Sequence, residues 1–127
     1  MTIKLSNVVI DCDDTLAVAR FWSAALGRPL DPEPSGFFAS IGRSSTEGAE
    51  AWFFAKVPEP KSAKNRMHVD LHAQDRADVE DEVGRLVGLG AVVVRAPKEE
   101  YGVYWATLQD PEGNEICVCD AGRLASH

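Results

Sequence analysis

The sequence predicts an α+β fold built from two similar units, each with the order strand, helix and three strands. One observation is an internal repeat, which is the sequence signature of a duplicated structural unit. Equivalent residues are separated by a nearly constant interval of 61 to 63 positions: Asn7 and His68, Gly27 and Gly90, Ala55 and Cys117. The other observation is that each half contains a helical pattern after an Asp, followed by three extended segments.

In the first half, residues 7–14 form a β-type run whose last residues, Asp13 or Asp14, can cap a helix. An amphipathic pattern with helical spacing follows, and it consists of Val18, Phe21, Trp22, Ala25 and Leu26. Gly27 permits a left-handed helix end, and Pro29 prevents continuation. The extended segments expected after it are 29–31, 36–43 and 49–57.

The second half repeats this order from residue 68. The β-type run 68–75 precedes a helix capped by Asp75 or Asp78 and ended by Gly90. The apolar stripe of that helix consists of Val79, Val83, Leu86 and Val87. The expected strands are 91–96, 102–109 and 114–119. A hairpin turn should join the last two, because Pro111 presets a turn dihedral and Gly113 can adopt a positive φ.

The length of 127 residues fits one domain, 1–127, with one core of ordinary size. Within it we expect module one at about 3–57, a linker at about 58–65 and module two at about 66–120. The prolines of the linker make it extended and unsuited to a central strand.

In their order, these motifs resemble the vicinal oxygen chelate superfamily, which has the glyoxalase/bleomycin-resistance fold. The resemblance is carried by Phe21-Trp22 before Leu26-Gly27 and by the late Asp110-Pro-Glu-Gly-Asn turn. The linker 57–61 followed by 64–71 resembles the glyoxalase-like branch. The resemblance implies that each module curls into part of a half-open mixed sheet, with the helix on one face and a ligand cup on the other. It also implies a homodimer.

Side chains alternate between the two faces of a strand, so parity assigns residues to the cup. The helix-facing set comprises Val8, Ile10, Cys12, Trp52, Phe54, Val69, Leu71, Ala73, Ile116 and Val118. The candidate ligand-binding residues are Asn7, Asp11, Phe53, His68, His72, Trp105 and Cys117. Glu115 also falls on the cup face. Trp105 is the best candidate for a platform on which a flat ligand stacks.

The alternation His68-x-Asp70-x-His72 is the sharpest local feature. A carboxylate between two imidazoles could orient a histidine, and His68 with Asp70 could act as a catalytic general base. The alternative is a strand with one solvated face. The cations Lys61, Lys64 and Arg66 could likewise attract an anionic ligand or merely solvate the linker.

The resemblance also implies a metal site at four cup positions, which here hold Asn7, Ala55, His68 and Cys117. Ala55 has no donor atom and Asn7 is a poor ligand for transition metals. We therefore expect no cofactor. If an ion binds, its ligands are His68 and Cys117, with Asp70 conceivable as a third, and the ion is divalent zinc, nickel, manganese or iron.

Charge and composition exclude several classes of protein. The net charge of −7 and the short basic cluster argue against a nucleic-acid partner. No segment approaches the roughly 18 apolar residues of a membrane helix. We read no signal peptide at the start and expect three reduced thiols, both of which suggest the cytoplasm.

Two functions remain open from the sequence. The first, slightly favoured, is metal-independent binding or sequestration of a small molecule, motivated by the depleted metal quartet. The second is a metal-dependent glyoxalase-like lyase, isomerase or dioxygenase that uses His68. A third possibility is a domain whose pocket has decayed and which acts through its surface.

Overall fold

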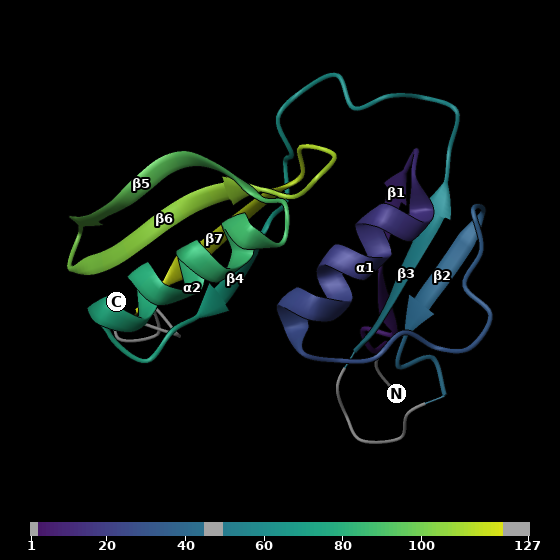
Figure 1. The fold of residues 1–127 in the computed structure, drawn as a ribbon, viewed down its shortest axis with the longest axis horizontal. Coiled ribbons are helices and arrows are strands. Elements are labelled where there is room, and N and C mark those ends of the chain that lie inside the picture. The colour runs from purple at the N-terminus through teal and green to yellow at the C-terminus, as the bar shows by residue number, and fades with distance from the viewer. Residues whose placement is uncertain (1–2, 45–49, 121–127) are drawn as a thin grey trace. The chain divides into compact units, whose positions relative to one another are not determined.

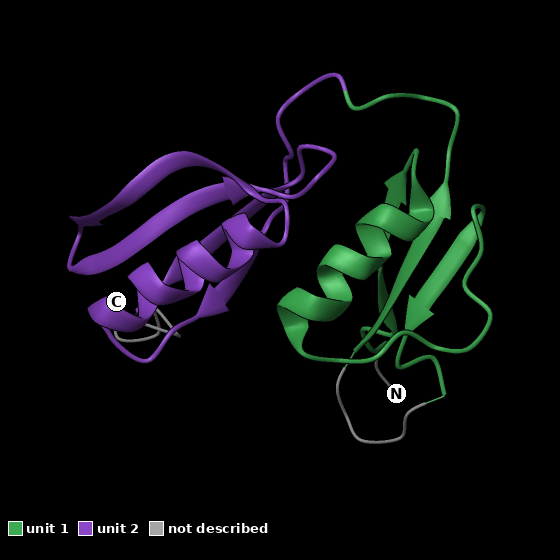
Figure 2. Ribbon diagram, in the orientation of Figure 1, with its two compact units in different colours: residues 1–61 green, residues 62–127 purple. Residues whose placement is uncertain are grey.

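The computed structural model describes residues 3–44 and 50–120 of the chain. They form two compact units, residues 1–61 and 62–127 (Figure 2). Each unit contains one helix and one sheet, of three strands in the first unit and four in the second. The α+β class predicted from the repeat is therefore confirmed.

In the first unit, α1 packs across one face of a mixed sheet with the order β1-β3-β2 (Figure 1). Its elements are β1 (Asn7–Cys12), α1 (Thr15–Leu26), β2 (Phe38–Ile41) and β3 (Ala51–Lys56). β1 runs parallel to β3, and β2 runs antiparallel to it. The strand expected at 29–31 is only a single bridge between Leu30 and Ile41. The segment is only three residues long and begins with Pro29, which has no backbone N–H to donate to a neighbouring strand.

The second unit is the more complete copy, with sheet order β4-β7-β6-β5 and α2 against one face (Figure 1). Its elements are β4 (Val69–His72), α2 (Arg76–Gly88), β5 (Val92–Glu100), β6 (Val103–Gln109) and β7 (Glu115–Cys119). β4 is parallel to β7, and the other neighbours are antiparallel. The turn before β7 forms as predicted, with Gly113 at φ 90°.

The sequence left two possible N-cap residues open for each helix. The structure selects Asp14 for α1 and Asp75 for α2. Asp14 accepts a hydrogen bond from the Ala17 N–H at 3.1 Å, and Asp75 accepts one from the Asp78 N–H at 2.8 Å. These contacts satisfy N–H groups of the first turn that have no partner within the helix. Gly27 ends α1 in the left-handed region, with φ 66°.

The helix-facing side chains predicted by parity form the two cores. In the first unit, Trp22 of α1 stacks on Trp52 of β3 with ring centroids 5.0 Å apart, and Phe54 is fully buried. In the second, Ile116 and Val118 of β7 are buried. The same alternation leaves Val9, Asp11, Asp70 and His72 exposed on the opposite faces.

Strand register changes one equivalence of the repeat. The two helix caps, Asp14 and Asp75, are 61 residues apart. The same interval separates Val9 from Asp70, so these two strand residues are equivalent. Asp70 pairs with Cys117, whereas Val9 pairs with Phe53. The structural counterpart of Cys117 is therefore Phe53 and not Ala55, and the sequence alignment was wrong by two residues on that strand. Neither Phe53 nor Ala55 carries a side-chain atom that could bind a metal ion.

No helix within the described ranges is long and apolar enough to cross a membrane.

Candidate functional site

A cavity of about 390 Å³ lies in the second unit. Its walls come from the segment before β4, from β4 itself, and from the faces of β6 and β7 that point away from α2. Val103 and Trp105 of β6 contribute apolar surface, while Lys64, His68 and Asp70 contribute charged or polar groups. The helix covers the other face of the same sheet, so the hollow face is available to a ligand, as parity predicted.

His68 and Asp70 form a pair on one side of the cavity. They are two residues apart along an extended segment, so both side chains leave the same face. The His68 Nε2 lies 3.2 Å from the Asp70 Oδ1, and each side chain is about half exposed. A carboxylate at this distance fixes the orientation of an imidazole. The pair therefore has the geometry of an oriented base or a metal ligand.

Cys117 lies next to this pair on the neighbouring strand. It is the register partner of Asp70, and its Sγ is 3.6 Å from the Thr107 Oγ1. Burial raises the pKa of the Cys117 thiol; the hydrogen bond with Thr107 lowers it in part, and the charge of Asp70 raises it further. The thiol is therefore protonated at neutral pH, which argues against a Cys117–His68 nucleophile pair, because the thiolate is the reactive form.

The raised pKa predicts slow alkylation of Cys117. Thiolate supply limits the reaction with iodoacetamide, so the rate should reach half its maximum above pH 9.0, the ordinary value for the thiol. Mass spectrometry of the digested protein measures the rate at Cys117 directly, and a Cys117→Ser variant identifies its peptide. Half-maximal labelling near pH 7 would contradict the protonated state.

Glu115 anchors the segment that enters the second unit. Its carboxylate is 7% exposed and accepts hydrogen bonds from the Asn65 N–H at 2.8 Å and the Gln109 Nε2 at 3.3 Å. In the amide orientation that satisfies both atoms, the Asn65 side chain also bonds the Glu115 Oε1 and N–H, at 3.1 and 3.2 Å. Parity placed Glu115 on this face. The sequence carried no signal for Asn65, because its contact depends on how the linker folds back.

Arg95 covers the ring of Trp105, the predicted stacking platform. The Arg95 Cζ lies 4.0 Å from the ring centroid, and Nη1 donates to the Trp105 carbonyl at 2.9 Å. Nη2 approaches the Glu100 Oε1 at 3.3 Å. Cation–π contact and these hydrogen bonds hold the indole in one orientation. Sequence analysis missed Arg95, and the only available signal was a single basic residue within a run of valines.

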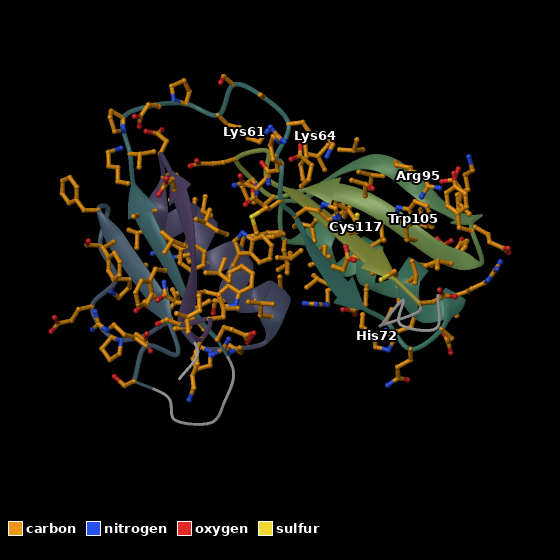
Figure 3. All side chains as sticks on the ribbon, turned by 180° about the vertical axis from the view of Figure 1, so that it is seen from behind. Lys61, Lys64, His72, Arg95, Trp105 and Cys117 are labelled. Atoms are coloured by element: carbon orange, nitrogen blue, oxygen red, sulfur yellow. The ribbon has the colours of Figure 1, made fainter. Side chains whose placement is uncertain are left out.

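The structure brings four predicted site residues to one cavity: His68, Asp70, Trp105 and Cys117. His72 does not line it, because it ends β4, is exposed, and lies at the far end of the sheet from Lys64 (Figure 3). The other three candidates belong to the first unit, and since each unit is described by itself, their place at a ligand stays a prediction: Asn7 and Asp11 on β1, Phe53 on β3.

The donors do not match the metal quartet that the resemblance implies. Ala55, and equally Phe53, the register counterpart of Cys117, offers no ligand atom. The second unit instead contributes three donors, since ligand atoms of His68, Asp70 and Cys117 lie within 4.8 Å of one another. A three-donor group differs in kind from the implied quartet and lies entirely within one unit.

Comparison with known proteins places the chain in a family. The family of glyoxalase-like domains matches residues 7–119. No curated protein matches. A glyoxalase/bleomycin resistance protein/dioxygenase family enzyme from Burkholderia phytofirmans is similar at 22% identity, with a TM-score of 0.77 over 93% of this chain and 98% of that one.

Two further solved structures share the fold. A glyoxalase-related enzyme from Fulvimarina pelagi is 15% identical, with a TM-score of 0.74 over 92% of this chain and 87% of that one. A lactoylglutathione lyase from Agrobacterium tumefaciens is 18% identical, with a TM-score of 0.65 over 95% and 96%. At these identities the solved structures establish the fold alone. Since the family match covers most of the sequence, the chain belongs to the glyoxalase-like domains of the vicinal oxygen chelate superfamily.

Proposed function

We propose that this glyoxalase-like protein binds a small molecule in the cavity of its second unit and needs no metal ion to do so. The observation that carries the proposal is the cavity itself, which combines an apolar wall at Val103 and Trp105 with a few oriented polar groups. A volume of about 390 Å³ falls within the range of small-molecule sites, roughly 300–1,000 Å³. Such sites typically join aromatic walls to a small number of placed polar groups.

The polar groups of the cavity already have partners within the protein. Asp70 pairs with His68, Glu100 with Arg95, and Glu115 with Asn65 and Gln109. These contacts hold the side chains in place before a ligand arrives, so little conformational entropy is lost on binding. The arrangement supports binding or sequestration of a ligand by a largely preformed site.

The chemistry of the donors supports independence from metal. The positions that the superfamily uses in the first module hold Asn7 and Ala55, which together offer at most one weak ligand. In the second module the His68 Nε2 already lies 3.2 Å from the Asp70 Oδ1, and the thiol of Cys117 is protonated at neutral pH. An ion would have to separate that pair and displace the thiol proton to bind.

The second candidate is a metal-dependent lyase, isomerase or dioxygenase. It is favoured by the convergence of His68, Asp70 and Cys117 and by the name of the lactoylglutathione lyase that shares the fold. A divalent zinc, nickel, manganese or iron ion held there would polarise oxygen atoms of a substrate. His68 would then serve as a ligand, and without metal it would serve as a base oriented by Asp70.

The assembly and compartment that we propose follow from two further observations. β4 and β5 lie at the edges of their four-stranded sheet, and edges in natural proteins are usually covered, so a homodimer is the expected assembly. None of the three cysteines forms a disulfide, which fits the reducing cytoplasm. We propose no nucleic-acid partner and no membrane partner.

One experiment separates the two candidates. The protein, stripped with EDTA, is titrated by calorimetry with 2-naphthoate, 2-naphthamide and 2-naphthylmethylamine, and the titrations are repeated after loading with zinc, nickel, manganese or iron. The proposal expects binding of at least one compound to the stripped protein, with affinity unchanged by metal. Binding that appears only after metal loading, with near-stoichiometric metal that is lost in His68→Ala, would instead establish the metal-dependent candidate.

A further inference from the structure

The cavity has one cation without a carboxylate partner. Its acidic side chains, Asp70, Glu100 and Glu115, all accept contacts from protein groups. Lys64 also lines the cavity, and its only hydrogen bond among residues 3–44 and 50–120 is a long one, 3.5 Å from Nζ to the Asn65 carbonyl. Among the described residues Lys64 is therefore a positive charge at this cavity that no carboxylate contacts, although the chain as a whole carries a net charge of −7.

Lys64 is held at the cavity by its neighbour. Asn65 donates to the buried carboxylate of Glu115 through its backbone N–H at 2.8 Å and, in the satisfied amide orientation, through its side-chain nitrogen, while its side-chain oxygen accepts from the Glu115 backbone N–H. Three hydrogen bonds to a buried group fix the backbone next to Lys64, so its ammonium can reach the cavity without a large loss of chain entropy. The electrostatic influence of Lys64 extends to Cys117, whose pKa it lowers slightly.

The positively charged Lys64 and the aromatic ring of Trp105 lie at different places in the site. Figure 3 shows Lys64 on the segment that enters the second unit, and Trp105 farther along the sheet. The Trp105 ring, fixed by Arg95, provides an apolar surface, and Val103 on the same strand extends it. A ligand that satisfies both parts carries an anionic group at one end and an apolar, planar body at the other.

The other charges of the cavity limit how negative that group can be. Asp70, Glu100 and Glu115 would repel a dianion, and phosphate sites in proteins normally supply several donors, such as arginines or a helix N-terminus. A single lysine matches a single carboxylate. Resting on the proposed function, and deepening it, we infer that the ligands are planar apolar monocarboxylates whose carboxylate is bound by Lys64.

The test compares 2-naphthoate with 2-naphthamide, which has the same ring system and no charge, by calorimetry on the full chain. Wild-type protein should bind the acid about fivefold more tightly than the amide. Lys64→Gln should abolish this preference, whereas Lys64→Arg should retain it. Lys61→Gln is the matched control, because Lys61 lies on the same connecting segment but does not line the cavity. It should change neither affinity.

Three results would overturn the inference. The first is equal binding of acid and amide by the wild type, which leaves the proposed pocket function intact. The second is an equal loss in Lys64→Gln and Lys61→Gln, which would show a general electrostatic effect and not a specific contact. The third is the absence of binding by both compounds and by 2-naphthylmethylamine, which would remove the proposed function together with the inference.

Discussion

Replacing Phe54 by alanine is expected to lower the free energy of unfolding by about 3–5 kcal/mol. Phe54 is 0% exposed and occupies the middle of β3, between Ile10 of β1 and Ala39 of β2. The substitution removes apolar surface from the core of the first unit and leaves a cavity that the surrounding strands can fill only partly. Urea denaturation followed by circular dichroism measures the change.

The neighbouring residue provides the control for this prediction. Phe53 lies on the same strand with its side chain on the opposite face, is partly exposed, and contacts Phe38 edge to face at 5.4 Å. Phe53→Ala should cost clearly less, about 1–2 kcal/mol, because Phe53 is partly exposed whereas Phe54 is fully buried. Equal losses in the two variants would show that the face assignment of β3 is wrong.

Trp105→Ala is expected to weaken binding of 2-naphthoate at least about tenfold, the largest effect we expect on the proposed function. The substitution removes the stacking surface from the cavity wall and the cation–π contact with Arg95, while the hydrogen bond from Arg95 to the backbone carbonyl at position 105 remains. Calorimetric titration gives the ratio of dissociation constants. The affinity for 2-naphthamide should fall by a similar factor, because both compounds share the ring.

Trp105→Phe is the matched variant, since it retains an aromatic face of smaller area. We expect it to lose only a few-fold in affinity, and to unfold at nearly the wild-type urea concentration. If Trp105→Ala binds both compounds as tightly as the wild type, the ligand wall lies elsewhere and the surface-acting alternative gains support. If Trp105→Phe loses as much as Trp105→Ala, a hydrogen bond of the indole, and not its flat face, carries the binding.

The hydrophobic periodicity of the sequence and its helix-cap and turn residues predicted most of the fold. The helix stripes, the Asp caps, Gly27 and the turn at residues 110–114 are local signals, and each depends on residues that are close together in the chain. Strand alternation was sufficient to assign Trp52 and Phe54 to the core. The same local reasoning failed for the strand at 29–31, which forms only a single bridge.

The site was only partly predictable, because a binding cavity depends on contacts between residues far apart in the sequence. Parity identified His68, Asp70, Trp105 and Cys117 as residues of one face, and the structure brings them to one cavity. Parity could not predict that His72 on the same face lies outside it. Nor could it predict the contact of Asn65 with Glu115 or that of Arg95 with Trp105.

The sequence alone therefore determined the duplicated α+β units and the faces of their strands. Only the tertiary structure decided which charges of the cavity are matched, which strand positions pair, and that Lys64 is held at the site. The physical reason is that helix caps and alternation act within a few residues of the chain. Strand register depends instead on how segments some 40 to 50 residues apart meet, as Asp70 and Cys117 do.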